Sequence, residues 1–291
     1  MIVLVTGASG YFGSNMIRYL LEKGDEVYGI SRNDKLISSN LMYHQIKGDL
    51  SEWNFDTDLP PKLDAIIHLA QSMEYRKFPD GIDDMIAVNI LSSIKLADYG
   101  RKVGVKVFFF SSTGNVYQHS SLPLHEESTL DSSSFYAANK ISVELLLKPF
   151  SVYFNVIIGR IFGIYGAGQK DKLIPNIIGK IKNSETIQLA GDIGPMINFI
   201  HIKDLVEIVY IIINKGRSGY EIFNLGGEYG ITLKSIVYKI YEYLNVVPNV
   251  ERTNQVAPKM IGDISKLKKV LGAFQFRIID SELPGIIDKT K

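Results

Sequence analysis

The chain has 291 residues, which is enough for one large domain or for two coupled lobes. Hydrophobic residues make up 46% and charged residues 22%, as is typical of a globular enzyme, and a net charge of +1 without a dense basic stripe excludes a dedicated nucleic-acid binder. Cysteine is absent, which excludes disulfides and thiolate catalysis, and the five histidines lack the spacing of metal ligands. No metal site is therefore predicted.

The N-terminal stretch MIVLVTGASG has no basic segment and only a four-residue apolar run, so it does not resemble a secretory signal peptide. The longest apolar stretch, residues 206–214, is interrupted by Glu207 and is too short to span a bilayer. We therefore expect a cytoplasmic protein with no membrane partner.

The first 30 residues alternate between strand and helix patterns. Residues 2–5 form an apolar run typical of a buried parallel strand, an amphipathic helix is predicted over 11–23, and a second strand follows at 26–30. The alternation continues, which predicts the α/β class and a doubly wound parallel sheet. Later strands are expected at 42–49, 64–70, 105–112 and 153–160, and the longer helices at 83–103 and 134–147.

After residue 163 the regular alternation ends. We therefore predict a large domain over residues 1–163 and a smaller α/β lobe over 164–291, interleaved with the first. In the smaller lobe, helices are expected at 173–182, 202–213, 232–244 and 263–271, with strands near 186–189 and 221–225.

A glycine-rich turn, GASGYFG, joins the first predicted strand to the first helix. Glycines allow a tight turn and let a pyrophosphate approach the helix N-terminus, where free N–H groups favour anions. The position directly after a buried strand at the start of the chain makes the pattern more specific than glycine spacing alone, although a turn without a ligand is the alternative. We predict a dinucleotide bound at Gly7, Gly10, Tyr11, Phe12 and Gly13.

The end of the second strand bears on which dinucleotide is bound. An acidic residue there would accept a hydrogen bond from the ribose 2′-hydroxyl of NAD. This chain has Ser31 and Arg32, and an arginine can bind a 2′-phosphate, so NADP is favoured over NAD. Asp34 weakens this preference, and Arg32 could also be an ordinary surface charge. Further cofactor contacts are predicted at Asp49, Leu50, Leu69, Ala70 and Gln71.

The spacing Tyr-x-x-x-Lys occurs three times. One pair lies on the first helix, which runs away from the glycine turn, and one lies in a strand, where the two functional groups need not meet. Only Tyr136 and Lys140 lie one turn apart on a helix that follows the fifth strand, beyond the carboxyl ends of the strands, where ligands gather in open α/β sheets. The other two pairs are Tyr19 with Lys23 and Tyr43 with Lys47.

Tyr136 and Lys140 suit acid–base chemistry at a carbinol carbon. A free tyrosine has a pKa of about 10 and is therefore a poor base at neutral pH. An ammonium one turn away and a positive nicotinamide would both favour the phenolate and lower that pKa. Lys140 can also bind the nicotinamide ribose, and Thr113 offers a hydroxyl to the substrate oxygen. We therefore predict that Thr113, Tyr136 and Lys140 are catalytic while a hydride passes between substrate and nicotinamide.

Several motifs occur in the order found in one enzyme family: TGASGYFG, SSTGNVY, YAANK, FIHIKDL, NLGG and DISKLKKVLG. Together they resemble the extended short-chain dehydrogenase/reductase superfamily and, within it, the NAD-dependent epimerase/dehydratase family of nucleotide-sugar enzymes. The resemblance extends from residue 1 to about Gly272. It implies that residues 1–163 are an NAD(P)-binding Rossmann domain with the catalytic residues, and that 164–291 form the substrate-binding lobe.

The resemblance also implies roles for individual residues. Thr113, Tyr136 and Lys140 match the catalytic threonine, tyrosine and lysine of the family, while Ser111 and Asn89 match positions that line the nicotinamide end of the pocket. A nucleotide sugar is the implied substrate. A homodimer is implied because relatives pair the two helices that correspond to 83–103 and 134–147.

The chain departs from the family pattern at several positions. Related 4,6-dehydratases carry an Asp-Glu pair after the catalytic threonine, where this chain has Gly114 and Asn115, so that activity is not expected. Positions that contact the substrate diphosphate in many relatives are also replaced, which weakens the inference of a nucleotide-activated substrate. These positions are Gly163, Ile197-Asn198 and the stretch APKM at 257–260.

The leading hypothesis is an NAD(P)-dependent oxidoreductase or epimerase acting at C4 of a nucleotide-activated hexose. The preference for NADP favours the reduction of a 4-keto sugar. One alternative is a nucleotide-sugar 4-epimerase with tightly bound NAD, and another is a reductase of a non-sugar carbonyl. A third, from a different class, is a non-catalytic NADP-sensing protein.

Overall fold

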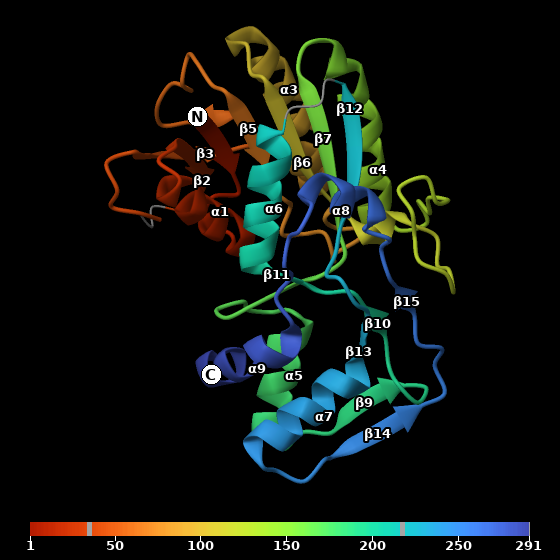
Figure 1. The fold of residues 1–291 in the computed structure, drawn as a ribbon. Coiled ribbons are helices and arrows are strands. Elements are labelled where there is room, and N and C mark those ends of the chain that lie inside the picture. The colour runs from red at the N-terminus through yellow and green to blue at the C-terminus, as the bar shows by residue number, and fades with distance from the viewer. Residues whose placement is uncertain (34–36, 216–218, 291) are drawn as a thin grey trace. The chain divides into compact units, whose positions relative to one another are not determined.

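The structure, a computed structural model, describes residues 1–33, 37–215 and 219–290. The chain divides into two compact units, each built from segments that lie far apart in the sequence (Figure 1). Unit 1 comprises Met1–Val116, Thr129–Arg160 and Val206–Phe223. Unit 2 comprises Tyr117–Ser128, Ile161–Leu205 and Asn224–Lys291.

Unit 1 is built on an eight-stranded sheet. The strands are β1 (Ile2–Thr6), β2 (Glu26–Ser31), β3 (Tyr43–Asp49), β4 (Asn54–Phe55), β5 (Ala65–His68), β6 (Val107–Thr113), β7 (Asn155–Ile161) and β12 (Tyr220–Leu225). Their order is β12-β7-β6-β5-β1-β2-β3-β4, and the pairings of β1 with β2 and β5, of β2 with β3 and of β5 with β6 are parallel. This order, with β1 between β2 and β5, is that of doubly wound dinucleotide-binding folds. The predicted α/β fold is confirmed.

Two helices lie on one face of this sheet (Figure 1). Helix α1 (Tyr11–Glu22) buries the apolar face that the periodicity predicted, including Leu20. It lies beside α6 (Ile202–Asn214), where the rings of Tyr19 and Tyr210 meet edge-on at 5.6 Å. Within the described ranges, no helix is both long and apolar enough to cross a membrane, and the cytoplasmic location stays a prediction.

The other face of the sheet is covered by α3 (Ser92–Val103) and α4 (Phe135–Leu147), which pack against each other. Leu96 of α3 and Val143 of α4 are buried in one apolar cluster with Phe108 of the central strand β6. The packing of α4 on the sheet fixes its N-terminal end near the carboxyl end of β6.

The helix predicted over 83–103 is present, but it contains a π-helical segment. Helix α2 (Ile82–Met85) continues into the π-helical segment η1 (Ile86–Leu91) and then into α3. Short π-helical segments within α-helices are frequent at functional sites. Asn89, one of the predicted pocket residues, lies in η1.

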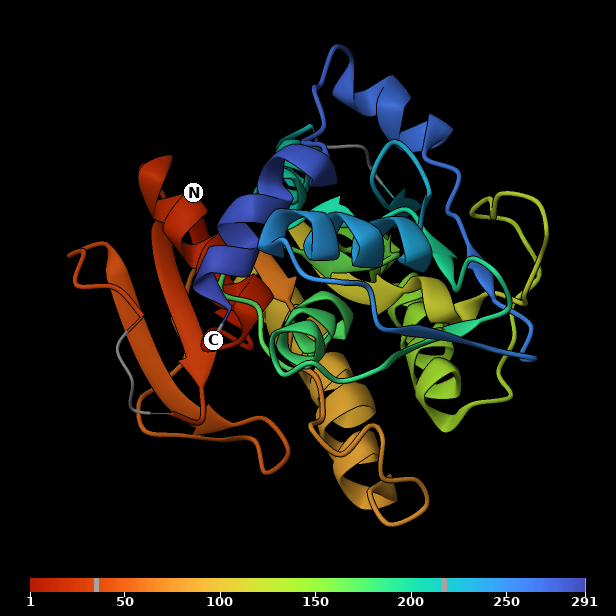
Figure 2. The same ribbon diagram turned by 90° about the horizontal axis from the view of Figure 1, so that it is seen from below.

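Unit 2 contains three helices that pack side by side (Figure 2). They are α5 (Leu173–Lys182), α7 (Leu233–Leu244) and α9 (Ile279–Lys289), and they share one apolar core with Tyr165 and strand residue Leu189. Helix α9 was not predicted because Pro284 and Gly285 in its middle disfavour a helix on propensity alone. Burial of its apolar face in the core offsets that preference.

Short strands and one short helix complete unit 2. The strand pairs β8–β11 and β9–β14 are parallel, and β10 lies between β13 and β15. The bounds are β8 (Ile164–Tyr165), β9 (Ile187–Ala190), β10 (Met196–Ile197), β11 (Ile200–His201), β13 (Ile231–Thr232), β14 (Val250–Thr253), β15 (Lys259–Met260) and α8 (Ser265–Leu271). Residues 206–223 lie in unit 1, although the sequence pointed to the smaller lobe, because β12 joins the large sheet.

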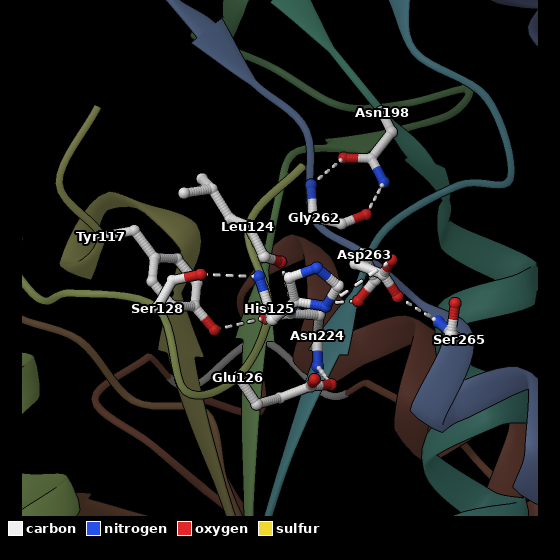
Figure 3. Close-up of polar contacts among 10 residues, drawn as sticks. All are labelled: Tyr117, Leu124, His125, Glu126, Ser128, Asn198, Asn224, Gly262, Asp263 and Ser265. Carbon is white, nitrogen blue, oxygen red and sulfur yellow. Dashed lines mark hydrogen bonds and ion pairs between the residues drawn. The ribbon is translucent and has the colours of Figure 1, made fainter. Parts of the chain in front are cut away.

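Asn224 ties several segments of unit 2 together (Figure 3). Its side-chain NH₂ donates to the carbonyl oxygens of Leu124 (2.7 Å) and Asp263 (3.0 Å), and its side-chain oxygen accepts from the Tyr117 hydroxyl (2.7 Å). Its backbone N–H donates to the carboxylate of Glu126 (2.9 Å). Because Asn224 is fully buried, these bonds replace the water that it would otherwise bind.

Asn198 makes a second set of bonds in the same region (Figure 3). Its NH₂ donates to the carbonyls of Gly227 (3.1 Å) and Gly262 (2.9 Å), and its oxygen accepts from the Gly262 N–H (3.0 Å). We call Asn198, Asn224 and the residues bonded to their side chains the asparagine cluster.

Candidate functional site

The glycine turn after β1 is too tightly packed for larger residues. Gly7 has a φ of +68°, which L side chains rarely adopt, and a Cβ on Gly13 would lie 2.1 Å from the Gly7 carbonyl oxygen. Gly10 is exposed and is the N-cap of α1, with no side-chain cap and no acidic residue in the first turn of that described helix. The positive end of α1 is therefore uncompensated, which fits a phosphate of a dinucleotide.

Ser31 and Arg32, the two residues behind the NADP prediction, differ in their exposure to solvent. The Ser31 side chain is buried and its hydroxyl donates to the Asn33 carbonyl (3.0 Å), whereas Arg32 is exposed. The serine hydroxyl is thus engaged within the turn. Asp34, whose charge weakened the NADP prediction, lies outside the described residues.

Asp49, at the end of β3, lies close enough to Arg32 for their charges to interact. Burial raises the pKa of Asp49, but hydrogen bonds from Ser51 and the charge of Arg32 outweigh it, so the pKa is lowered overall. The carboxylate therefore offsets part of the arginine charge on which the NADP prediction depends. Leu50, also predicted at the cofactor, is buried in the core of the sheet.

The carboxyl ends of β1 and β5 are joined through Thr6. Its hydroxyl oxygen accepts the backbone N–H groups of Leu69 and Ala70, each at 3.2 Å. A Cβ on Gly7 would lie 2.9 Å from the backbone nitrogen of Ala70, so the glycine turn and this strand end are in close contact. The structure thus brings these predicted cofactor residues together.

Two buried side-chain amides at this end of the sheet have incomplete hydrogen bonding. The Asn89 oxygen accepts the Ser72 backbone N–H (2.9 Å), but its NH₂ has no partner among the residues described. The Gln71 NH₂ is likewise buried and unpartnered within that part of the chain. A buried unsatisfied donor costs about 1–3 kcal/mol. Both groups therefore fit the oxygens of a bound cofactor.

Thr113 and Tyr136 are hydrogen-bonded to each other. Thr113 ends β6, and Tyr136 lies in the first turn of α4, which Ser134 caps by accepting the Ala137 N–H (3.1 Å). Burial raises the pKa of Tyr136 to about 12, while the bond to Thr113 acts in the opposite direction. The phenol is thus protonated at neutral pH in the cofactor-free protein.

Lys140 lies one turn after Tyr136 and is buried. Its ammonium donates to the Ser111 carbonyl oxygen (2.9 Å) and lies 4.8 Å from the centre of the Phe110 ring. Burial lowers the pKa of Lys140 to about 7, although the charge of Glu144 raises it. Ser111 thus meets Lys140 through its backbone oxygen.

His68 connects the strand ends to the π-helical segment. Its two ring nitrogens lie 2.6 Å from the Thr6 hydroxyl and 2.8 Å from the Ser93 hydroxyl, and Ser93 donates to the Asn89 backbone oxygen (2.5 Å). Burial, and to a smaller extent the charge of Lys140, lowers the pKa of His68 to about 3. His68 was not predicted, because a histidine in an apolar strand gives no sequence signal.

Tyr75 was also missed. It lies in the loop after β5, and its ring centre is 5.4 Å from that of Tyr136. Three residues later, the ring of Phe78 packs against that of Phe135, with 5.2 Å between the ring centres. The loop has no periodic pattern, so the sequence could not place it beside α4.

Other conspicuous residues have structural contacts. Arg160 and Glu144 form a buried ion pair (2.6 Å). Tyr19 of α1 lies beside Lys23, the C-cap of that helix, with the ammonium 5.0 Å from the ring centre. Asn115 is exposed and its backbone N–H donates to Thr113 (3.2 Å). Over the described residues, no group of three or more acidic or histidine side chains is arranged to hold a metal.

Comparison with known families gives a match over most of the chain. The sequence profile described as "NAD dependent epimerase/dehydratase family" matches residues 3–226. The match includes the glycine turn and the Thr113, Tyr136 and Lys140 positions.

Curated relatives include enzymes with different reactions. The UDP-glucuronate 4-epimerase of Thermodesulfobacterium geofontis is 29% identical, over 92% of this chain and 89% of its own length. The dTDP-4-dehydro-6-deoxyglucose reductase of Escherichia coli is 26% identical, over 98% and 96%. The dTDP-glucose 4,6-dehydratase of Haemophilus influenzae is 28% identical, over 84% and 80%.

Solved structures share the fold. UDP-glucuronic acid 4-epimerase from Bacillus cereus, in complex with UDP-glucuronic acid and NAD, superposes with a TM-score of 0.87 at 22% identity, over 100% of this chain and 99% of that one. UDP-N-acetylglucosamine 4-epimerase from Methanobrevibacter ruminantium gives 0.85 at 24% identity, over 98% and 96%. The cofactor named in the first of these is NAD, so the NADP preference gains no support. With the profile match, these findings show that the chain belongs to the NAD-dependent epimerase/dehydratase family, whose members are enzymes of the extended short-chain dehydrogenase/reductase type.

Proposed function

We propose that this protein is a nucleotide-sugar 4-epimerase with tightly bound NAD. The observation that carries the proposal is the arrangement at α4: a phenol hydrogen-bonded to Thr113 and followed one turn later by the buried ammonium of Lys140. The glycine turn lies in the same unit, as do the NH₂ groups of Gln71 and Asn89, which have no partner among the described residues, and all three fit the cofactor.

The chemistry that NAD supplies when bound is reversible hydride acceptance at the nicotinamide ring. With NAD bound, Tyr136 would act as the phenolate, which the positive nicotinamide and the charged Lys140 both favour. It would take the proton of the sugar C4 hydroxyl while the C4 hydrogen leaves as hydride, which makes a ketone. Thr113 donates a hydrogen bond to the ketone oxygen and holds it near the phenol. Once the hydride is back on the opposite face of C4, Tyr136 would return its proton to the C4 oxygen, which would give the epimer with no net oxidation.

Lys140 supports this proton transfer electrostatically. A charged ammonium one turn from Tyr136 favours the phenolate. Burial lowers the pKa of Lys140 to about 7. At neutral pH the fraction of Lys140 that carries a charge therefore responds to any charged group that binds nearby. An anionic substrate or cofactor group nearby would favour the charged form.

The epimerase is favoured over the reductase that the sequence suggested. Asp49 offsets the charge of Arg32, which reduces the reason to expect a 2′-phosphate. The relative from T. geofontis and the neighbouring structures from B. cereus and M. ruminantium are 4-epimerases.

The test is turnover without added cofactor. Purified protein is incubated with UDP-glucuronate, UDP-glucose or UDP-N-acetylglucosamine, and the products are separated by anion-exchange chromatography. We expect conversion of at least one of them to its C4 epimer, together with NAD released on denaturation. Absence of any epimer, with no NAD released, contradicts the proposal.

A 4-keto sugar reductase is the second candidate. The exposed Arg32 after β2 and the similarity to the E. coli reductase over 98% of this chain support it. This enzyme would oxidise NADPH stoichiometrically in the presence of a dTDP-4-keto-6-deoxyhexose. The epimerase leaves NADPH unchanged.

We also propose a homodimer formed through α3, η1 and α4. These elements pack together and leave Leu91, Leu145 and Leu146 exposed, with 49%, 63% and 43% of each residue accessible. Light scattering should give twice the chain mass, and Leu145→Glu should give the chain mass. A wild-type monomer contradicts this part of the proposal.

A further inference from the structure

The loop between β5 and α2 is held firmly in place. At its start, the Ser72 backbone N–H donates to the Asn89 side chain (2.9 Å), and the Ser72 hydroxyl donates to Asp84. Ser72 also accepts the Glu74 N–H (3.0 Å), and the Gly81 N–H donates to the Lys77 carbonyl (2.8 Å). The loop therefore presents its side chains from a fixed backbone.

This loop contacts the first turn of α4 through two ring pairs. Tyr75 meets Tyr136 at 5.4 Å with the rings tilted by 48°, and Phe78 meets Phe135 at 5.2 Å with a tilt of 31°. The guanidinium of Arg76 lies 5.1 Å from the centre of the Tyr75 ring. Tyr75 thus contacts both a cation and the phenol that we propose as the proton acceptor.

We propose that Tyr75 is a positioning residue for Tyr136. The Thr113 hydroxyl holds only the oxygen of the phenol, which leaves the ring free to tilt about that contact. The Tyr75 ring packs against it and restricts that tilt, so the oxygen stays directed at the substrate carbinol. Tyr75 also excludes water from that side of Tyr136. This inference rests on the proposed role of Tyr136 and extends it to a residue of the preceding loop.

The proposal separates two properties of Tyr75, its ring and its hydroxyl. Tyr75→Phe keeps the ring contact, so activity should stay close to that of the wild type. Tyr75→Ala removes the ring, and we expect kcat to fall about 10- to 100-fold, as for a small misplacement of a reacting group. The dissociation constant for NAD should not change, because Tyr75 is not among the predicted cofactor contacts.

A second measurement does not depend on the substrate. Tyrosinate absorbance is followed against pH in cofactor-free protein, and the curve of the same variant with Tyr136→Phe added is subtracted. The pKa of Tyr136, which burial holds near 12, should fall in Tyr75→Ala because water gains access to the phenol. It should fall less in Tyr75→Phe, which keeps the ring and loses only the charge of the Tyr75 phenolate, the smallest of the causes that act on the pKa of Tyr136. This measurement remains informative even if the proposed epimerase activity is wrong.

The matched control is Phe78→Ala, which removes a ring from the same loop at a position that contacts Phe135. It should lower neither kcat nor the pKa of Tyr136. The proposal is contradicted if Tyr75→Ala titrates like the wild type, if Tyr75→Phe is as impaired as Tyr75→Ala, or if Phe78→Ala gives the same losses. The last outcome would mean that the loop acts as a whole.

Discussion

Two buried polar regions, one in each unit, satisfy their hydrogen bonds in different ways. In the asparagine cluster of unit 2, every side-chain amide atom of Asn198 and Asn224 is bonded. In unit 1, at the carboxyl ends of the strands, the described chain offers no partner for the NH₂ groups of Asn89 and Gln71, and Lys140 is buried with its pKa lowered to about 7.

The number of hydrogen bonds that a buried amide makes distinguishes a structural role from a ligand-binding role in this protein. A buried amide whose oxygen and NH₂ are both hydrogen-bonded within the protein has no free group for a ligand. Its bonds stabilise the fold and hold segments that are distant in sequence together. A buried amide that lacks such a bond costs stability until a ligand supplies its partner. Replacement of Asn224 is therefore expected to lower the stability of the fold, whereas replacement of Asn89 is expected to weaken the binding of a ligand.

Loss of the Tyr136 hydroxyl should have the largest effect. Tyr136→Phe removes the proposed acid–base group, and kcat should fall by about 10²- to 10⁴-fold, the usual contribution of such catalysis. NAD should still bind, as judged by release of the cofactor on denaturation. Tyr19→Phe, in the equally spaced pair on α1, is the control and should keep the wild-type rate. A Tyr136→Phe enzyme with wild-type kcat would refute the assignment.

In unit 2, replacement of a fully hydrogen-bonded asparagine should lower the stability of the protein. Asn224→Ala removes three side-chain hydrogen bonds of a fully buried residue, those with the Tyr117 hydroxyl and with the carbonyls of Leu124 and Asp263, so the free energy of unfolding should fall by about 3 kcal/mol. Urea denaturation measures the change, and His125→Ala, which removes an exposed side chain 3.7 Å from Asp263, is the control with an expected loss under about 1 kcal/mol. If the free energy of unfolding fell equally in both variants, the structural role of the Asn224 hydrogen bonds would be contradicted.

His68 should make stability depend on pH. Its pKa is about 3 in the folded protein and about 6.5 when exposed, so the unfolded chain binds one more proton between these values. The free energy of unfolding should therefore fall as pH decreases from 6.5, by up to about 1.4 kcal/mol per pH unit. The window from pH 6.5 to 5 is the clearest, because few carboxylates titrate there. An identical slope in His68→Gln would contradict this role.

The smallest predicted effect has the opposite sign to that of Asn224→Ala. Gln71→Met replaces a buried NH₂, for which residues 1–33, 37–215 and 219–290 offer no partner, by an apolar group of similar shape. This should raise the free energy of unfolding of cofactor-free protein by about 0.5–1 kcal/mol. NAD affinity should fall about fivefold, as expected for one lost hydrogen bond. A variant that is less stable and binds NAD as well as the wild type would show that Gln71 has no role in the site.

The sequence predicted the fold through local patterns. The apolar run of β1, the glycine turn and the periodicity of α1 each follow from neighbouring residues, and with the strand that follows they predict the first strand–helix–strand unit of the parallel sheet. The Tyr136–Lys140 pair was chosen from three candidates by its place after β6. Its contacts with Thr113 and the Ser111 carbonyl could not be predicted, because they depend on tertiary packing.

What the sequence could not predict lies in non-local contacts. The π-helical segment at Asn89 arises within a helix whose residues read as α-helical, and α9 forms despite Pro284 because its apolar face is buried. Tyr75 and His68 reach the site through a loop and a buried strand without motif signals. The NADP preference rested on Ser31 and Arg32 alone, whereas Asp49, 17 positions after Arg32 in the sequence, modifies that charge in the folded chain.

The central claim is that hydrogen leaves C4 and returns to C4 of the same sugar while Tyr136 carries the proton. The most direct measurement uses C4-deuterated UDP-hexoses, including UDP-glucuronate, with NAD-loaded protein and no free cofactor, and mass spectrometry of the product. We predict a C4 epimer that keeps its deuterium, and almost none of it with Tyr136→Phe. An epimer that has lost the deuterium, or turnover only when NADPH is added, would contradict the account.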